Sequence, residues 1–217
     1  YDSKLNQKSV ENDLVSEKEK YVIKDSPLGF AKSQFHKTYI VSQTSDGIII
    51  IDQHAAHERI VYEKLKKSFS QKTIETQILL IPEIVKFDSD IIDIAINHQK
   101  VLQEYGLFIE RFGNDSIIVR EIPAILIGCQ IIKLVKEILN ELADIGTSEL
   151  VETNINKICS SMACHGSIRA GREMQQEEMN NLLREMETTP FSGQCNHGRP
   201  TYVELKLNDI EKLFGRK

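Results

Sequence analysis

Hydrophobic and polar positions alternate along the chain in a way that predicts strands and helices of a mixed α/β protein. Residues 35–41 and 47–51 have the composition of strands, and a Ser-Asp-Gly turn signal separates them. Four consecutive isoleucines, Ile48–Ile51, indicate that the second strand is buried on both faces. Residues 53–67 then predict a helix. Its expected inward positions are Ala55, Ile60, Val61 and Leu65.

A different order of elements follows between residues 76 and 146. It reads as a βαββα block, which predicts a smaller α/β subdomain inserted into the main one. The expected elements are a strand at 78–87, a helix at 89–105, a hairpin of 107–112 and 117–121, and a helix at 130–144.

The rest of the chain is expected to complete the main subdomain. Residues 27–75 and 147–217 would then form one discontinuous α/β unit of the α+β type, with a mixed sheet and helices. Residues 1–26 are polar and predict a linker. The other expected elements are helices at 148–172 and 175–187, a loop at 190–200 and a strand at 201–207.

Composition narrows the class of protein. The chain has 217 residues, 41% of them hydrophobic, so it can bury a sizeable core. A formal net charge of −5 argues against a domain that grips nucleic acid by bulk charge alone. No apolar run reaches the length of a membrane-spanning helix. Four cysteines are too few for a disulfide scaffold, which favours a cytosolic setting and directs attention to metal binding.

The first candidate site lies where the isoleucine strand meets the following helix. His54 and Glu58 are four residues apart, so they project from one helical face, and Asp52 at the strand end can turn toward them. Imidazole and carboxylate on one face form half of a metal site. The alternatives are that Asp52 caps the helix, that His54 is a partly buried histidine, and that Glu58 pairs with Arg59 or a lysine.

Two further segments add donors. In the stretch from Cys195 to Pro200, an extended Cys-x-His places sulfur and nitrogen on one side, Gly198 permits a sharp turn, and Arg199 is a candidate phosphate ligand. On the long helix, Cys164 lies among small residues that let another segment pack closely. Each segment also has a structural interpretation, a loop with a buried cysteine and a core cysteine respectively.

Taken together, the three segments offer more donors than one tetrahedral zinc requires. The candidate ligands are Asp52, His54, Glu58, Cys164, Cys195 and His197. A surplus carboxylate can bridge two metals, an arrangement that hydrolyses phosphodiesters. The order of residues in His54-Ala55-Ala56-His57-Glu58 does not fit the metalloprotease helix, in which glutamate follows the first histidine.

With these motifs in view, the chain resembles the C-terminal domain of the MutL family of DNA mismatch-repair proteins, in its endonuclease-bearing form. The family signature DQHA-x2-E-x4-E is matched from Asp52 to Glu63, and the motif C-[PN]-HGRP is matched from Cys195 to Pro200. The F-x-R motif is matched by Phe214-Gly215-Arg216. The A-C-[RK] motif is matched by Ala163-Cys164, but His165 replaces the basic residue.

The resemblance implies a homodimeric domain that carries a latent, metal-dependent endonuclease which nicks duplex DNA. It implies that the six candidate ligands hold metal, with Asp52, Glu58 and Arg199 catalytic, Zn²⁺ regulatory or structural, and Mn²⁺ or Mg²⁺ catalytic. It also implies a dimerisation subdomain with an inserted regulatory subdomain, and an N-terminal ATPase domain in the same chain. The expected partners are duplex DNA, bound weakly by this fragment, MutS and the DNA sliding clamp, in the cytoplasm and at the nucleoid during repair.

The segment from Gln77 to Pro82 fits the pattern Q-x-x-L-x-P, with Gln77, Leu80 and Pro82 at the fixed positions. It resembles the sliding-clamp-binding motif of this family. The alternative is an ordinary edge strand that contains a proline. For the domain as a whole, the alternative function is a non-catalytic dimerisation and docking module with a structural zinc.

Overall fold

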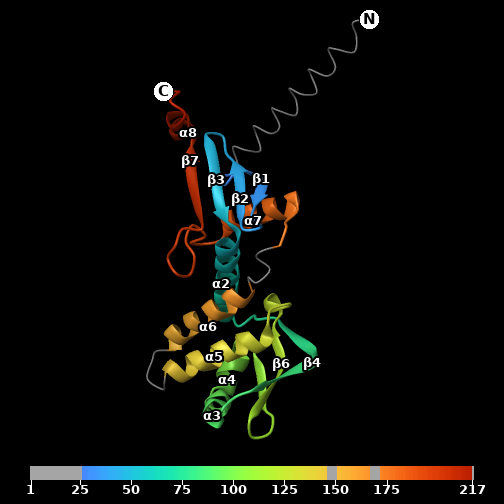
Figure 1. Ribbon diagram of the computed structural model, residues 1–217. Helices are drawn as coiled ribbons and strands as arrows, with labels where there is room; N and C mark the ends of the chain where they lie inside the picture. The colour runs from blue at the N-terminus through green and yellow to red at the C-terminus, as the bar shows by residue number, and fades with distance from the viewer. Residues whose placement is uncertain (1–25, 146–150, 167–171, 217) are drawn as a thin grey trace, which may run out of the picture. The chain divides into compact units, whose positions relative to one another are not determined.

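A computed structural model describes residues 26–145, 151–166 and 172–216 (Figure 1). The chain divides into two compact units. Unit 1 comprises residues 1–56 and 171–217, and unit 2 comprises residues 57–170. Unit 2 contains the whole predicted insertion, 76–146, together with flanking helices. All but the last residue of the predicted linker lie outside the described residues.

Unit 1 is built on a sheet with the strand order β1-β2-β3-β7. The expectation of a mixed sheet is wrong for the described strands, because all three of their pairings are antiparallel. The strands predicted at 47–51 and 201–207 are confirmed as β3 and β7. A short helix that the sequence pattern did not predict follows β7 at the C-terminal end. The elements are β1 (Phe30–Phe35), β2 (Tyr39–Gln43), β3 (Gly47–Asp52), β7 (Tyr202–Lys206) and α8 (Leu207–Leu213).

The prediction of one strand over residues 35–41 is wrong, because a tight turn divides this segment. The backbone N–H of Thr38 donates to the carbonyl of Phe35 at 3.0 Å. His36 and Lys37 between them have φ values of 49° and 53°. Such turns normally use Asn-Gly or Asp-Gly, so a His-Lys pair gives no turn signal in the sequence. β1 and β2 therefore form a hairpin.

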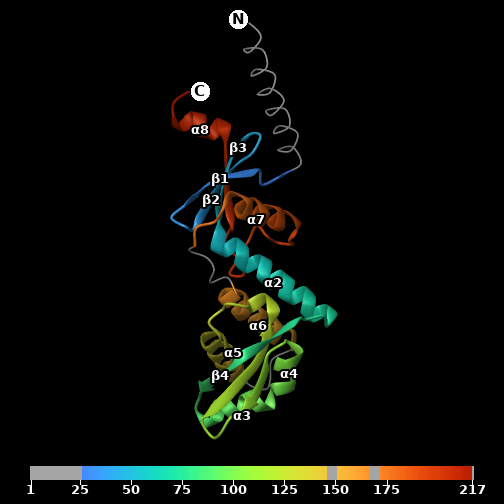
Figure 2. The same cartoon turned by 90° about the vertical axis from the view of Figure 1, so that its right-hand side faces the viewer.

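Helix α7 (Gln176–Thr188) packs against one face of this sheet (Figure 2). Side-chain oxygens of the helix tie it to the start of β1: Asn180 accepts from the backbone N–H of Ala31 at 2.9 Å, and Glu187 accepts from that of Leu28 at 2.7 Å. These two hydrogen bonds satisfy backbone donors just before β1 and at its start. On the next strand but one, β3, Ile49 and Ile51 are buried.

The expectation that the isoleucine strand is buried on both faces is wrong for the single chain. Ile49 and Ile51 are 3% and 0% exposed, whereas Ile48 and Ile50 on the other face are only partly buried. Successive side chains of a strand point to opposite faces. One face of the sheet is therefore left partly open in the described chain.

Unit 2 combines a three-stranded antiparallel sheet, order β4-β6-β5, with helices (Figures 1 and 2). The predicted hairpin is confirmed as β5 and β6. The helix predicted at 89–105 is divided at His98, which ends one helix and begins the next. The boundary between the units falls inside α2. The elements are α2 (Gln53–Gln71), β4 (Thr76–Lys86), α3 (Ser89–Asn97), α4 (Gln99–Glu104), β5 (Phe108–Arg111), β6 (Ser116–Pro123), a 3-10 turn η1 (Ala124–Leu126), α5 (Ile131–Ile145) and α6 (Val151–Gly166).

An aliphatic core joins these elements. It includes Leu65 of α2, Ile109 and Ile117 of the hairpin, Ile138 of α5 and Cys159 of α6, each at most 1% exposed. Among the predicted inward positions of α2, Ile60, Val61 and Leu65 are buried, but Ala56 takes the place expected for Ala55. The predicted fold class, a mixed α/β protein of the α+β type, is confirmed. None of the described helices is both long and apolar enough to cross a membrane.

Candidate functional site

Asp52 ends β3 and caps the helix that follows. Its Oδ1 accepts a hydrogen bond from the backbone N–H of Ala55 at 3.0 Å, which is the contact of an N-cap residue. Its own N–H donates to the carbonyl of Thr201 at 2.8 Å. The capping alternative is therefore confirmed. The second contact also joins the first motif to the residue that directly follows the Cys195–Pro200 motif.

The Cys195–Pro200 motif forms a closed loop in unit 1. The N–H of Cys195 donates to the carbonyl of Arg199 at 2.7 Å, and the N–H of Gly198 donates to that of Cys195 at 3.0 Å. The predicted sharp turn is confirmed, since Gly198 has a φ of 78°, which other residues adopt only with strain. Cys195 is 5% exposed, whereas His197 and Arg199 are exposed. The loop thus buries its thiol and presents its imidazole and guanidinium to solvent.

Glu58 and Cys164 meet in unit 2, although 106 residues separate them in the chain. The thiol of Cys164 donates to Oε1 of Glu58 at 3.0 Å. Glu58 is only 4% exposed, in the second turn of α2, and Cys164 lies near the end of α6. The first motif, Asp52–Glu63, and the third motif, Ala163-Cys164, therefore contact each other directly. The contact uses two of the side chains that the sequence singled out.

The environment of this pair favours a protonated thiol. Burial, and after it the hydrogen bond to Glu58 and the charge of that carboxylate, raise the pKa of Cys164 to about 12. Smaller contributions in the same direction come from the carboxylates of Glu137 and Glu141. A thiolate here would need a nearby cation to offset the negative charge around it.

Three polar contacts between α5 and α6 were missed by the sequence reasoning. Nε2 of His165 lies 2.6 Å from Oε2 of Glu137, and the hydroxyl of Ser161 donates to Oε1 of Glu141 at 2.9 Å and to Oε1 of Glu137 at 3.5 Å. His165 is 8% exposed. The available signal was the spacing of Glu137 and Glu141, four residues apart on one helix. His165, which the sequence analysis singled out beside Cys164, is therefore held by a carboxylate of α5.

The predicted metal ligands are divided between the two compact units. Glu58 and Cys164 belong to unit 2, and the others, Asp52, His54, Cys195 and His197, belong to unit 1. Carboxylate, imidazole and thiolate donors suit zinc, and carboxylates also suit manganese. However, in the parts of the chain that the structure describes, no group of three or more His, Cys, Asp or Glu side chains is gathered to hold a metal ion. The donor types fit the expected ions, and Glu58 and Cys164 are one pair of these donors in direct contact.

The Gln77–Pro82 segment lies in the edge strand β4 and begins within the ladder, where Gln77 pairs with Ile122. The pairing with β6 runs from Ile78 opposite Glu121 to Glu83 opposite Val119, so the residues between them bulge out of the ladder. Leu80 and Ile81 are 101% and 83% exposed. Two large apolar side chains are thus displayed at the edge of the sheet, where an ordinary strand would alternate between the core and solvent.

Comparison with known proteins identifies the family. The family model described as "MutL C terminal dimerisation domain" matches residues 32–174, so the chain belongs to that family. Among its curated relatives are the DNA mismatch repair proteins MutL of Bradyrhizobium sp. (strain BTAi1), 53% identical over 193 residues, and Brucella anthropi, 51% identical over 195 residues. These matches cover 89% and 90% of this chain and 31% of each relative. The chain thus spans about a third of the length of these relatives.

Proposed function

We propose that this chain is the C-terminal domain of a DNA mismatch-repair protein that homodimerises and carries a latent, metal-dependent endonuclease for duplex DNA. The observation that carries the proposal is the pair of contacts made by the first motif. Asp52 is hydrogen-bonded to Thr201 beside the second motif, and Glu58 to Cys164 of the third. Each contact links segments more than 100 residues apart, the first within unit 1 and the second within unit 2, which supports a common function for these segments.

In this proposal the metal has six candidate ligands, with Zn²⁺ regulatory or structural and Mn²⁺ or Mg²⁺ catalytic. The ligands are Asp52, His54, Glu58, Cys164, Cys195 and His197. When bound, the catalytic metal would lower the pKa of a water molecule and neutralise charge on the scissile phosphate. The side chains of the protein would bind and position the phosphate. Arg199 is exposed on the loop, where its guanidinium can pair with a phosphate, and Gly198 holds the turn that presents it.

The acidic chain is expected to need help in reaching DNA. A net charge of −5 gives little attraction to the phosphate backbone. We propose that an N-terminal ATPase domain of the same chain, MutS and the sliding clamp hold DNA nearby and raise its effective concentration at this domain. Such a role places the protein in the cytoplasm, at the nucleoid during repair.

The open face of the unit 1 sheet is the surface we assign to the homodimer. Ile50 lies opposite Val41 and Val203 in the neighbouring strands, and Ile48 lies opposite Leu205. Val203 and Leu205 are 49% and 39% exposed. Residues paired across strands share a face, so these five side chains form one apolar surface. A second copy seated there would give the isoleucine strand the two-sided burial that its sequence predicts.

The function is tested by nicking of a supercoiled plasmid by a full-length protein that contains this chain. We expect conversion to the open-circular form with Mn²⁺ and none with EDTA. The alternative, a docking module with a structural zinc, predicts that zinc binds and no metal supports nicking. Absence of nicking with Mn²⁺, Mg²⁺ and Zn²⁺, in the presence of clamp and MutS, would reject the nuclease.

We also propose that the bulged segment of β4 binds the sliding clamp, through Gln77, Leu80 and Pro82. The support is the exposure of Leu80 together with Ile78 and Ile81, since a group of exposed apolar side chains at a sheet edge is typical of an interaction site. Replacing Leu80 by aspartate is expected to weaken clamp binding roughly 10-fold or more, because an anchor side chain is lost and a charge introduced.

Surface plasmon resonance with immobilised clamp measures this effect. Ile84 of the same strand, 48% exposed and outside the motif, provides the matched control Ile84→Asp. The Leu80 side chain is fully exposed, so it adds no buried apolar area to the fold. Leu80→Asp should therefore leave the thermal midpoint unchanged. Equal binding by the parent and Leu80→Asp would remove the clamp assignment.

A further inference from the structure

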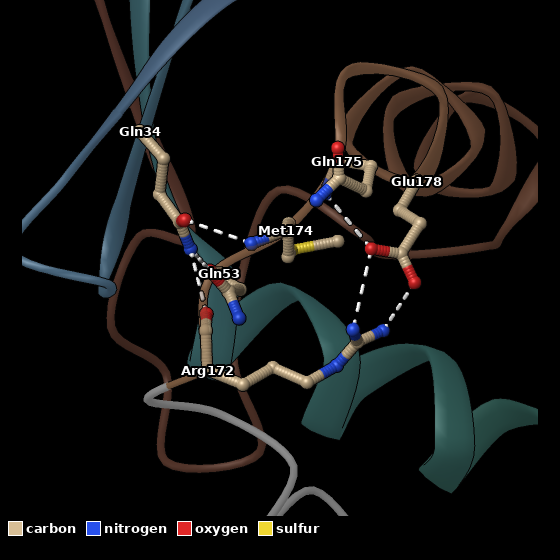
Figure 3. A network of polar contacts seen from close by, with 6 residues as sticks. All are labelled: Gln34, Gln53, Arg172, Met174, Gln175 and Glu178. Atoms are coloured by element: carbon tan, nitrogen blue, oxygen red, sulfur yellow. Dashed lines mark hydrogen bonds and ion pairs between the residues drawn. The ribbon is translucent and has the colours of Figure 1, made fainter.

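One side chain of β1 joins the start of α2 to the segment before α7. The amide nitrogen of Gln34 donates to Oε1 of Gln53 at 2.5 Å and to the carbonyl of Arg172 at 3.1 Å. Its oxygen accepts from the backbone N–H of Met174 at 3.0 Å. Figure 3 shows the three contacts converging on the end of this side chain. The partners lie 19, 138 and 140 residues away in the sequence.

Gln53 is the member of the first motif that carries no metal-ligand chemistry of its own. It is 5% exposed, and its backbone N–H donates to the carbonyl of Thr38 at 2.9 Å. A buried amide without partners is costly, so the bond from Gln34 fixes the Gln53 side chain. Asp52 and His54 flank Gln53 on the same backbone. Fixing Gln53 therefore restricts the junction between β3 and α2, where Asp52 ends the strand and His54 lies in the first turn of the helix.

The other end of the bridge is itself anchored. The guanidinium of Arg172 pairs with the carboxylate of Glu178, which also accepts from the backbone N–H of Gln175 (Figure 3). This Glu178 contact is half of the capping box at the start of α7. Gln34 is thus bonded to a segment that is held in place by the adjoining helix, and not to a loose loop.

We propose that Gln34 is a positioning residue for the candidate metal site: its amide bridges Gln53 and the 172–174 segment and thereby orients Asp52 and His54. The inference rests on the proposed function, because it assumes that these two side chains bind a metal. Groups hydrogen-bonded directly to metal ligands are typically worth about 10–100-fold in metal affinity or activity. Gln34 acts one step further out, through Gln53, so the lower end of that range is expected.

The test compares Gln34→Leu with the parent. Leucine has a similar volume and removes all three hydrogen bonds. We expect the Mn²⁺ concentration for half-maximal nicking by the full-length protein to rise about 10-fold, with the maximal rate largely recovered at saturating Mn²⁺. Calorimetric titration of the full-length protein with Mn²⁺ alone should show the same loss of affinity. A merely structural role would lower the thermal midpoint and leave the affinity of the folded fraction unchanged.

Two further variants keep the result decisive. Gln34→Glu can still accept from Met174, and from a flipped Gln53 amide, so it should keep the fold and lose affinity by an intermediate factor of about 3. Gln103→Leu makes the same substitution at an exposed position of α4 in unit 2 and should have no effect. If the parent binds Mn²⁺ and nicks DNA while both Gln34 variants match it, the positioning role is wrong and the nuclease stands. If the parent neither binds Mn²⁺ nor nicks, both proposals fail.

Discussion

Replacing Glu58 by glutamine is expected to reduce manganese-dependent nicking by roughly 100-fold or more. Loss of a group that only orients a metal ligand costs about 10–100-fold, and Glu58 is proposed as a ligand itself. The substitution is nearly isosteric. In the parent the Cys164 thiol donates to Oε1 of Glu58 at 3.0 Å, and the amide oxygen of the variant can still accept this hydrogen bond. The measurement is the initial rate of open-circle formation from supercoiled plasmid.

The effect on activity can be separated from an effect on folding. Burial is the largest cause of the raised pKa of Cys164, so the thiol stays protonated at neutral pH with or without the Glu58 carboxylate. The variant therefore places no new charge in this buried pair. Glu110→Gln is the matched control, because Glu110 lies in an exposed ion pair with Arg120 in the same unit. A Glu58→Gln protein that nicks as fast as the parent would remove this residue from the site.

Asp52→Asn sharpens the same experiment, since Asp52 has two possible roles. Asparagine caps helices about as well as aspartate, so α2 should still begin with its hydrogen bond to Ala55. What is lost is the negative charge. Loss of nicking with an unchanged thermal midpoint would assign Asp52 to the chemistry, whereas retained nicking would leave it only the capping role.

The second large effect is expected at the dimer. Replacing Ile50 by aspartate should raise the dimer dissociation constant on the order of 100-fold, about 3 kcal/mol, because it places an unpaired charge at the centre of a desolvated apolar surface. Ile50 of β3 lies between Val41 of the central strand β2 and Val203 of the edge strand β7. Sedimentation velocity over a concentration series would show a shift from dimer to monomer.

Leu80→Asp serves as the control for the dimer experiment. It introduces the same charge at a fully exposed apolar position of unit 2 and should leave the dimer intact. Circular dichroism would verify that Ile50→Asp keeps its secondary structure, since the Ile50 side chain lies on the partly open face. An unchanged dissociation constant for Ile50→Asp would exclude this face as the interface.

Local patterns were sufficient for most elements. The isoleucine strand, the helix after it and the hairpin of β5 and β6 were predicted, because periodicity and turn residues depend only on neighbours in sequence. The failures also have local reasons. His36 and Lys37 adopt positive φ without the usual turn residues, and His98 divides a helix whose apolar pattern continues past it. Because none of these three residues is the glycine, asparagine or proline that usually marks a turn or a helix end, the sequence pattern did not indicate these two breaks.

The sequence by itself determined which donors are present and which family the motifs resemble, since the order Asp52-Gln53-His54 and the Cys195–Pro200 loop are visible as letters. Only the tertiary structure decided that Glu58 meets Cys164, that Glu137 holds His165, and that Gln34 bridges to Gln53. The physical reason is that such contacts depend on how separate helices and strands pack. Packing is set by the whole core, so the partner of a given side chain cannot be found in its neighbouring residues.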